Sequence, residues 1–379
     1  MAQPDVARER DVMILFLCGD VMTGRGIDQI LPSPGEPRLF EPAVGSALEY
    51  LELAERASGR IPRPVGYDYV WGDALPVLQR MQPCGRIVNL ETAVTTSGAA
   101  CPDKGIHYRM HPANVRCLSA AAIDCCVLAN NHVLDWGRAG LEETLSVLHG
   151  ESIGTAGAGP DDRSAASPAI IKTGAGGRIL VYGFAVSSSG APREWRATAE
   201  SPGINWLESL SRRNAERIGE RIAAERRPAD IVIASIHWGG NWGYGVSREE
   251  REFAHRLLDC GSVDVVHGHS SHHPKGMEVY RRKLILYGCG DFLNDYEGIG
   301  GYESFHPELV LMYFPGLDGA NGDLLELTLV PMRIRRFRIE HGPADALQWL
   351  AGTLDRECRR WGGRVRRQAD ETLALDWGA

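Results

Sequence analysis

The sequence predicts an α/β fold built on layered, mixed and mainly parallel sheets. Short apolar segments alternate with longer amphipathic segments, which is the pattern of βαβ units. Metal-binding types of side chain directly follow several of the apolar segments. The chain of 379 residues is long enough for one large domain or two modest ones with a buried core.

The first half of the chain begins with an apolar strand over 12–18, which ends before Gly19 and Asp20. Residues 31–66 are rich in proline and glycine, so we expect an insertion or a lid-like loop there. Beyond it, apolar runs and helical periodicity alternate. The expected helices cover 43–57, 74–82, 114–121 and 139–149, and the expected strands cover 86–89, 124–128, 169–171 and 179–184.

The second half continues this alternation and adds a hairpin. Two strand-like segments, 277–280 and 283–287, flank Arg281 and Arg282, which predicts a turn at these arginines. The other expected elements are helices over 207–226, 248–259 and 343–361 and strands over 231–236, 263–266, 309–314 and 324–332. We therefore expect one domain over 11–340, with the insertion at 31–66, and a helical extension over 341–379.

Composition narrows the class of protein. The net charge of −8 argues against a nucleic-acid partner, which usually selects a basic face. No run of about 18 apolar residues is present, so we expect no membrane span and a cytoplasmic protein. The nine cysteines are odd in number and form no C-x-x-C pair, so we expect packed thiols rather than zinc or redox sites.

Ligand-type side chains follow five expected strands at the point where each strand ends. Because ligands of open α/β sheets gather outside the carboxyl ends of the strands, these side chains are expected to meet at one edge. They are Asp20, Asn89 with Glu91, Asn130 with Asn131 and His132, His237, and His267 with His269. The pattern predicts a metal centre or an acid–base centre at that edge.

Six motifs between about residues 14 and 294 resemble the CapA family. They are Gly19-Asp20-Val21-Met22-Thr23-Gly24-Arg25, Asn89-Leu90-Glu91, Ala129-Asn130-Asn131-His132-x-x-Asp135-x-Gly137, His237-Trp238-Gly239, Gly268-His269-x-x-His272 and Tyr287-Gly288-Cys289-Gly290-Asp291-Phe292. The resemblance implies a calcineurin-like metallophosphoesterase fold and an association with poly-γ-glutamate capsule synthesis. It lies closest to the CapA-like epimerases of lasso-peptide biosynthesis.

The resemblance also implies roles for individual residues. It makes His132 the acid–base residue, oriented by Asp135. It places metal ligands at Asp20, Glu91 or Asn89, Asn131, His237, His269 and His272, with Asp291 as an added carboxylate that could be a ligand or a neighbour of one.

Three departures from the family pattern bear on the metal. Met22 stands where the family has histidine, Asp291 stands where it has asparagine, and serines replace part of the His-rich motif before His272. Fewer imidazoles and more oxygen ligands favour one hard divalent ion, Ca²⁺, Mg²⁺ or Mn²⁺, over a zinc or iron pair. No nucleotide-binding glycine loop of the Walker A type is present, and no organic cofactor is expected.

His–Asp pairs supply the expected proton chemistry. An aspartate that accepts from one ring nitrogen fixes the tautomer and raises the basicity of the other nitrogen. His132 with Asp135 is one candidate pair, and His237 or His269 with Asp20 or Asp291 is the second. Two opposed pairs could remove a proton from one face of a carbon and return one to the other, which is epimerisation. The same groups could instead activate water for hydrolysis.

Four further residues are candidate substrate contacts. Arg25 and Arg109 carry guanidinium groups that suit a peptide or glutamyl carboxylate, although each could equally form an internal ion pair. Trp238 could line a pocket or pack in the core, and Asn89 lies within the same motif region.

Three functions remain open on the sequence alone. The first is a metal-dependent peptide epimerase acting on a residue, preferably the C-terminal one, of a ribosomal precursor peptide such as a lasso-peptide precursor. The second is a phosphoesterase, or an amide hydrolase or ligase acting on poly-γ-glutamate. The third is a metal-stabilised module that binds a peptide without turnover. The expected partner is a peptide substrate, such as a precursor peptide, and the sequence predicts no oligomeric state.

Overall fold

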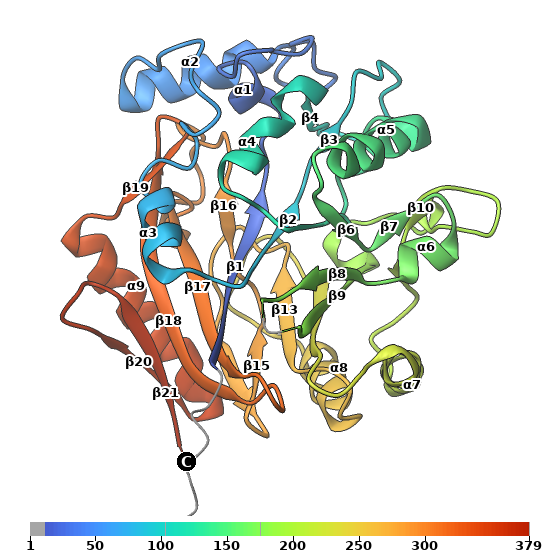
Figure 1. Ribbon diagram of the computed structural model, residues 1–379. Helices are drawn as coiled ribbons and strands as arrows, with labels where there is room; N and C mark the ends of the chain where they lie inside the picture. The colour runs from blue at the N-terminus through green and yellow to red at the C-terminus, as the bar shows by residue number, and fades with distance from the viewer. Residues whose placement is uncertain (1–11, 103, 175, 379) are drawn as a thin grey trace, which may run out of the picture.

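The computed structural model describes residues 12–102, 104–174 and 176–378 and shows a layered α/β sandwich (Figure 1). Two mixed sheets lie face to face with helices on their outer sides. Apolar side chains from both sheets, such as Leu17 and Val127 from one and Ile233 and Val265 from the other, form one core between them. The expected layered α/β architecture is confirmed at this level.

The first sheet has ten strands within the described residues, and β1 lies near its centre. In spatial order the strands are β20 (Gly363–Arg367), β21 (Leu373–Trp377), β18 (Leu324–Arg335), β17 (Leu309–Asp318), β1 (Val12–Val21), β2 (Gly85–Leu90), β5 (Cys125–Val127) and β6 (Gly154–Ala156), with β16 (Asp291–Leu293) on β1 and β19 (Arg338–His341) on β18. The run from β1 to β6 is parallel, whereas β17 to β20 are antiparallel. The parallel half therefore ends at a single edge.

The second sheet has seven strands among the residues described, and four of them form a parallel centre. In order they are β11 (Trp206–Leu207), β9 (Arg178–Val186), β12 (Ile231–His237), β13 (Val265–His269), β15 (Lys283–Leu286) and β14 (Met277–Tyr280), with β8 (Ala169–Lys172) on β9. The expected hairpin is confirmed as β14–β15, with Arg281 and Arg282 in its turn at positive φ. Two short pairs lie apart: β3 (Ala93–Val94) with β4 (Arg109–Met110), and β7 (Ala158–Gly159) with β10 (Gly203–Ile204).

Helices cover both outer faces. The α-helices are α1 (Arg25–Asp28), α2 (Ala47–Ser58), α3 (Ala74–Met81), α4 (Arg116–Ala120), α5 (Gly137–Gly150), α6 (Asp162–Ala166), α7 (Arg212–Glu225), α8 (Arg248–Asp259) and α9 (Ala344–Cys358) in the described chain. The 3-10 turns are η1 (Pro112–Val115), η2 (Ser187–Ser189), η3 (Arg193–Trp195), η4 (Glu303–Phe305) and η5 (Arg359–Trp361). Helices α3 to α5 pack on the first sheet and α7 and α8 on the second, whereas α9 packs into the shared core.

Two expected boundaries are corrected. The helix expected over 207–226 begins at Arg212, because Ser211 caps it through the backbone N–H of Asn214 and the segment before it forms β11. The extension at 341–379 is not helical throughout, because β20 and β21 add a hairpin to β18. Val365, Leu373 and Leu375 alternate with exposed or half-buried residues and point into the shared core.

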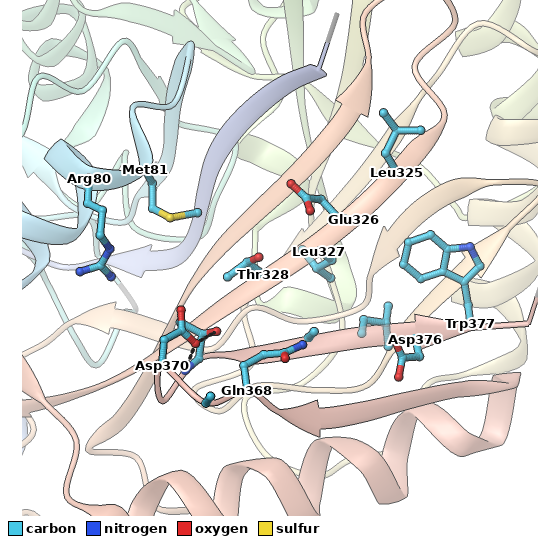
Figure 2. A pocket seen from close by; sticks show the side chains of 14 residues that line it. Arg80, Met81, Leu325, Glu326, Leu327, Thr328, Gln368, Asp370, Asp376 and Trp377 are labelled. Carbon is cyan, nitrogen blue, oxygen red and sulfur yellow. Dashed lines mark hydrogen bonds between the residues drawn. The ribbon is translucent and has the colours of Figure 1, made fainter. Parts of the chain in front are cut away.

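A cavity of about 710 Å³ lies over the outer strands β18 and β21, beside the end of α3 (Figure 2). Arg80, Glu326, Gln368 and Asp370 are among its lining residues, and none of the candidate site residues lines it. No helix in the described part of the chain is long and apolar enough to cross a membrane. The candidate chemistry therefore lies elsewhere, at the ends of the parallel strands.

Candidate metal and acid–base centre

The carboxyl ends of parallel strands from both sheets bring the candidate residues together. Asp20 lies opposite Asn89 across β1 and β2, where a register shift interrupts the β1–β2 pairing. His237 and His269 end β12 and β13 and lie opposite each other. Glu91 follows β2, and all five side chains are buried. The prediction that these strand ends meet is confirmed by this placement.

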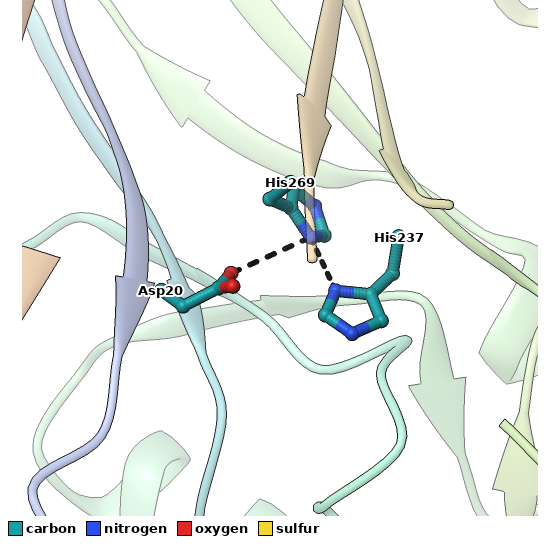
Figure 3. Close-up of side chains that lie close together, drawn as sticks. All are labelled: Asp20, His237 and His269. Atoms are coloured by element: carbon teal, nitrogen blue, oxygen red, sulfur yellow. Dashed lines mark hydrogen bonds and ion pairs between the residues drawn. The ribbon is translucent and has the colours of Figure 1, made fainter. Parts of the chain in front are cut away.

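Asp20, His237 and His269 form one of two clusters that could hold a metal ion (Figure 3). The Nδ1 atoms of the two histidines lie 2.7 Å apart, and Nδ1 of His269 lies 3.8 Å from Oδ1 of Asp20. One ligand atom from each residue falls within 4.8 Å of the others. Two imidazole nitrogens and a carboxylate oxygen are therefore aimed at one small volume, as in a metal site.

Hydrogen bonds behind the two histidines fix which nitrogen of His269 carries its proton. Nε2 of His267 lies 2.8 Å from the carbonyl oxygen of Cys18 and must donate to it. Nδ1 of His267 therefore accepts from the hydroxyl of Ser235, 3.0 Å away. The Ser235 oxygen in turn accepts from Nε2 of His269 at 2.9 Å. This chain leaves the Nδ1 lone pair of His269 directed at the cluster.

A hydrogen bond also fixes which ring nitrogen of His237 carries the proton. Nε2 of His237 lies 3.0 Å from Oδ1 of Asn131 and donates to it, which leaves Nδ1 of His237 unprotonated. Burial lowers the pKa of both His237 and His269 well below the usual value, so both rings are neutral. Two lone pairs that face each other repel unless a cation lies between them. The donor set therefore fits a divalent metal ion.

The buried carboxyl groups of Asp20 and Glu91 also fit a bound cation. Burial, followed by the charge of Asp291, raises the pKa of Asp20 to about 7. Burial and the neighbouring Asp20 raise the pKa of Glu91 well above its usual value. Oε2 of Glu91 is buried and has no hydrogen-bond partner in the described residues. A bound cation would stabilise both carboxylates in their charged form.

A second group, Asp20, His272 and Asp291, shares Asp20 with the first. Nδ1 of His272 lies 2.8 Å from Oδ1 of Asp291, and Asn294 donates to the other oxygen of Asp291 at 2.8 Å. Burial lowers the pKa of His272, but the charge of Asp291 and its hydrogen bond outweigh burial, so the pKa lies above the usual value. The expected contact of His269 with Asp20 is present at 3.8 Å, and the shorter His272–Asp291 contact adds a hydrogen-bonded His–Asp pair that the sequence did not indicate.

The first His–Asp pair is the one that the sequence indicated. Nδ1 of His132 lies 2.7 Å from Oδ2 of Asp135, and Nε2 lies 3.7 Å from Oε1 of Glu91. Burial lowers the pKa of His132 to about 4. Lys104 contacts Asp135 and the carbonyl oxygen of Asn131, and its Nζ lies 2.8 Å from Nδ1 of His132. His132 is therefore a neutral, oriented imidazole beside the carboxylate cluster.

The prediction that Arg25 and Arg109 bind substrate carboxylates is corrected. The guanidinium of Arg25 is buried, pairs with Asp295 and Glu41, and lies 3.8 Å from the ring centre of Tyr50. Arg109 donates to two backbone carbonyl groups and lies 3.9 Å from the ring centre of Trp136. Both guanidinium groups make internal contacts, so neither is free to form paired hydrogen bonds with a substrate carboxylate.

The prediction that Trp238 and Asn89 contact a substrate is also corrected, because both side chains make internal hydrogen bonds. Trp238 is buried among the residues under α8, and its indole donates to the carbonyl oxygen of Tyr287 at 3.0 Å. The Asn89 amide donates to Oδ1 of Asp20 at 2.7 Å and therefore orients that carboxylate. Met22, at the family's histidine position, is buried, and its sulfur accepts a hydrogen bond from Tyr296.

Sequence reasoning missed three residues that shape the centre, Ser235, Lys104 and Asn294, and it did not identify the hydrogen bonds through which His267 links Cys18 to Ser235. Ser235 and His267 lie two residues before His237 and His269, so strand alternation places them on the same face, and this signal was available. Lys104 and Asn294 lie outside regular elements, where no periodicity indicates direction.

Comparison with known proteins shows the family to which this chain belongs. The model of the family "Bacterial capsule synthesis protein PGA_cap" matches residues 14–296. A probable polyglutamine synthesis accessory protein of Mycobacterium tuberculosis is 45% identical over 98% of this chain and 97% of its own length. The capsule biosynthesis protein CapA of Bacillus anthracis is 26% identical over 76% of this chain and 61% of its own, and the PGA biosynthesis protein CapA of Bacillus subtilis is 26% identical over 75% and 64%. This chain therefore belongs to the PGA_cap family of bacterial capsule synthesis proteins.

Proposed function

We propose that the chain is a metal-dependent enzyme that hydrolyses or transfers amide bonds in a glutamyl polymer. The observation that carries the proposal is the convergence of Asp20 with the lone pairs of His237 and His269, next to the oriented pair His132–Asp135. The name of one relative, a probable polyglutamine synthesis accessory protein, and the association with poly-γ-glutamate that the family resemblance implies support a polymer of glutamate or glutamine units as the substrate class.

A metallophosphoesterase-like fold is part of this proposal. The family resemblance implies it, and two features support it: the two-sheet sandwich and a ligand cluster at the carboxyl ends of β1, β12 and β13. We place one divalent ion, Ca²⁺, Mg²⁺ or Mn²⁺, on Asp20, His237 and His269, with Glu91 beside it. When bound, such an ion supplies Lewis-acid polarisation of a substrate carbonyl group.

In this proposal, His132 is the residue that transfers the proton. Asp135 accepts from Nδ1–H of His132, so Nε2 holds a free lone pair on the side of Glu91. Nε2 accepts a proton from water as the water oxygen bonds to the amide carbon. The carbon–nitrogen bond then breaks, and the same proton passes to the leaving nitrogen. Water is consumed, and a carboxylic acid and an amine are released; the acid then gives its proton to solvent.

Epimerisation is the second candidate, because the structure contains two His–Asp pairs near one carboxylate cluster. His132 reaches this cluster through Glu91, and His272 shares it through Asp20. One pair would take the Cα proton of a residue, for example the C-terminal residue of a ribosomal precursor peptide of the lasso type. The other would return a proton to the opposite face.

Isotope labelling separates the two reactions. The metal-loaded protein is incubated with a γ-glutamate oligomer or a candidate precursor peptide, once in D₂O and once in ¹⁸O-labelled water. Amide hydrolysis predicts shorter chains with ¹⁸O in the new carboxylate and no deuterium at Cα. Epimerisation predicts Cα deuterium in a chain of unchanged length. If the protein binds both substrates but incorporates neither ¹⁸O nor deuterium, both reactions are overturned. The protein would then be a non-catalytic binding module.

A further inference from the structure

A second cavity, of about 290 Å³, lies between α6, α7 and the segment 196–208. Three arginines line it: Arg196 from the loop, and Arg217 and Arg221 from α7. Trp206 forms part of its wall, and Asp162 and Glu208 also line it. Three guanidinium groups against two carboxylates leave an excess of positive charge in this cavity.

In the part of the chain that the structure describes, two of these arginines lack a protein partner for their guanidinium group, and the third, Arg221, contacts a carbonyl oxygen and lies 5.9 Å from the ring centre of Tyr182. Among the described residues, Arg196 and Arg217 form no ion pair or side-chain hydrogen bond, and Asp162 and Glu208 pair with neither of them. Arg221 donates to the carbonyl oxygen of Ala166, but its buried Nε has no partner in the described chain. Arg217 and Arg221 are four residues apart on α7, so their like charges repel on one face of the helix. An anion with several oxygens would satisfy these donors.

The cavity is joined to the candidate metal centre by one short segment. Gly190 lies against Asn131, since a Cβ at Gly190 would stand 3.4 Å from the Asn131 amide nitrogen. Trp195 lies beside Lys104, whose Nζ is 5.2 Å from the centre of the indole ring. Arg196 follows directly and lines the cavity. The seven residues from Gly190 to Arg196, which are six Cα–Cα steps, span at most about 20 Å.

We propose that this arginine cavity is a secondary binding site for carboxylate groups of a polymer whose reacting unit occupies the metal centre. The substrate class rests on the proposed function, whereas the anion site rests on the arginines alone. Guanidinium forks recognise carboxylates through paired charge-assisted hydrogen bonds. A carboxamide carries no charge, so the cavity selects glutamate units over glutamine units. It also selects long chains over short ones.

Binding by the full-length protein tests this directly. The probes are a γ-glutamate oligomer of about eight residues, long enough to exceed ~20 Å, a glutamine oligomer of equal length and a γ-glutamate dimer. The variants are Arg196→Gln and Arg217→Gln. Arg213→Gln is the matched control, because it makes the same change on α7 outside the cavity. Thermal unfolding verifies that each variant is folded, and Arg196, an exposed loop residue, provides a test that does not disturb α7.

We expect each cavity variant to bind the long glutamate oligomer about tenfold more weakly or worse, with the dimer unaffected and Arg213→Gln within about twofold of wild type. Equal affinity of the wild type for the glutamate and glutamine oligomers would overturn the proposal. So would an equal loss in Arg213→Gln and Arg217→Gln. Arginine-dependent binding without turnover would overturn the proposed function alone. Turnover without arginine-dependent binding would overturn this site alone.

Discussion

His237 and His269 face each other through Nδ1 atoms 2.7 Å apart, while the second nitrogen of each ring is engaged on the far side. The partners Ser235 and Asn131 determine where the protons lie, and they leave both lone pairs directed inward. This arrangement, rather than the number of histidines, is the strongest structural support for a metal ion next to Asp20.

Ser235 should control metal affinity without touching the metal. We expect Ser235→Ala to weaken metal binding roughly 10- to 100-fold, because His269 loses the acceptor that fixes its tautomer. Isothermal titration of the metal-stripped protein measures the effect. Ser262→Ala is the control, since Ser262 is a buried serine whose hydroxyl has no partner in the described residues. Equal metal affinities in the two variants would show that Ser235 does not control metal binding.

His132 should be needed for turnover and not for metal retention. We expect His132→Ala to lower kcat by about 10²- to 10⁴-fold, because it removes the proton-transfer group. Metal content should stay at the wild-type level, since His132 is outside both candidate ligand groups. His149→Ala, at an exposed position on α5, is the control for histidine removal. Full activity in His132→Ala would contradict the assigned role.

Arg25 should contribute to stability. Its side chain is buried between Asp295 and Glu41, so Arg25→Met would leave two carboxylates without their cation. We expect a loss of about 3–5 kcal/mol in the free energy of unfolding. Arg56→Met, which breaks an exposed pair with Glu52, should cost about 0–1 kcal/mol. Urea denaturation compares the two variants, and similar losses would show that Arg25 is not an internal anchor.

Glu278 should make stability depend on acid. Burial raises the pKa of this carboxyl, but hydrogen bonds from Arg251 and Tyr287 outweigh burial and hold the pKa below its usual value. A lowered carboxyl pKa stabilises the fold above the unfolded-state pKa of about 4.3, and this contribution is lost as the pH falls towards the folded-state value.

We therefore expect the unfolding free energy of wild type to fall more steeply than that of Glu278→Gln between about pH 5 and pH 3. Urea denaturation at several pH values measures both slopes. Glu252→Gln, on the exposed side of α8, controls for the loss of one surface carboxylate. Parallel curves for wild type and Glu278→Gln would refute the assignment.

The strand ends were predictable because they depend on local sequence. An apolar run that stops at Asp20 or His237 places that residue at the edge of a parallel sheet, whatever else the fold does. The pairing of His272 with Asp291 was not predictable, because it joins a loop after β13 to β16 across the chain. Sequence spacing carries no information on such a contact.

The substrate contacts were the weakest predictions. Arg25 lies at a strand end, as a substrate-binding residue would, but Asp295 is 270 positions away and neutralises it. Conversely, nothing in the periodicity of α7 distinguishes Arg217 from Arg213, although of these two only Arg217 lines the arginine cavity. Long-range packing decides which charged side chains stay free, and a single sequence does not encode it locally.

Metal content of the purified full-length chain, measured by elemental mass spectrometry beside His269→Ala and the control His255→Ala, tests the central claim most directly. The account predicts about one divalent ion per chain in wild type and in His255→Ala, which alters a histidine paired with Glu278. His269→Ala should retain its fold by circular dichroism and lose the ion. Wild-type metal content in His269→Ala, or no divalent ion in wild type after dialysis against it, would contradict the assignment of Asp20, His237 and His269 as the metal site.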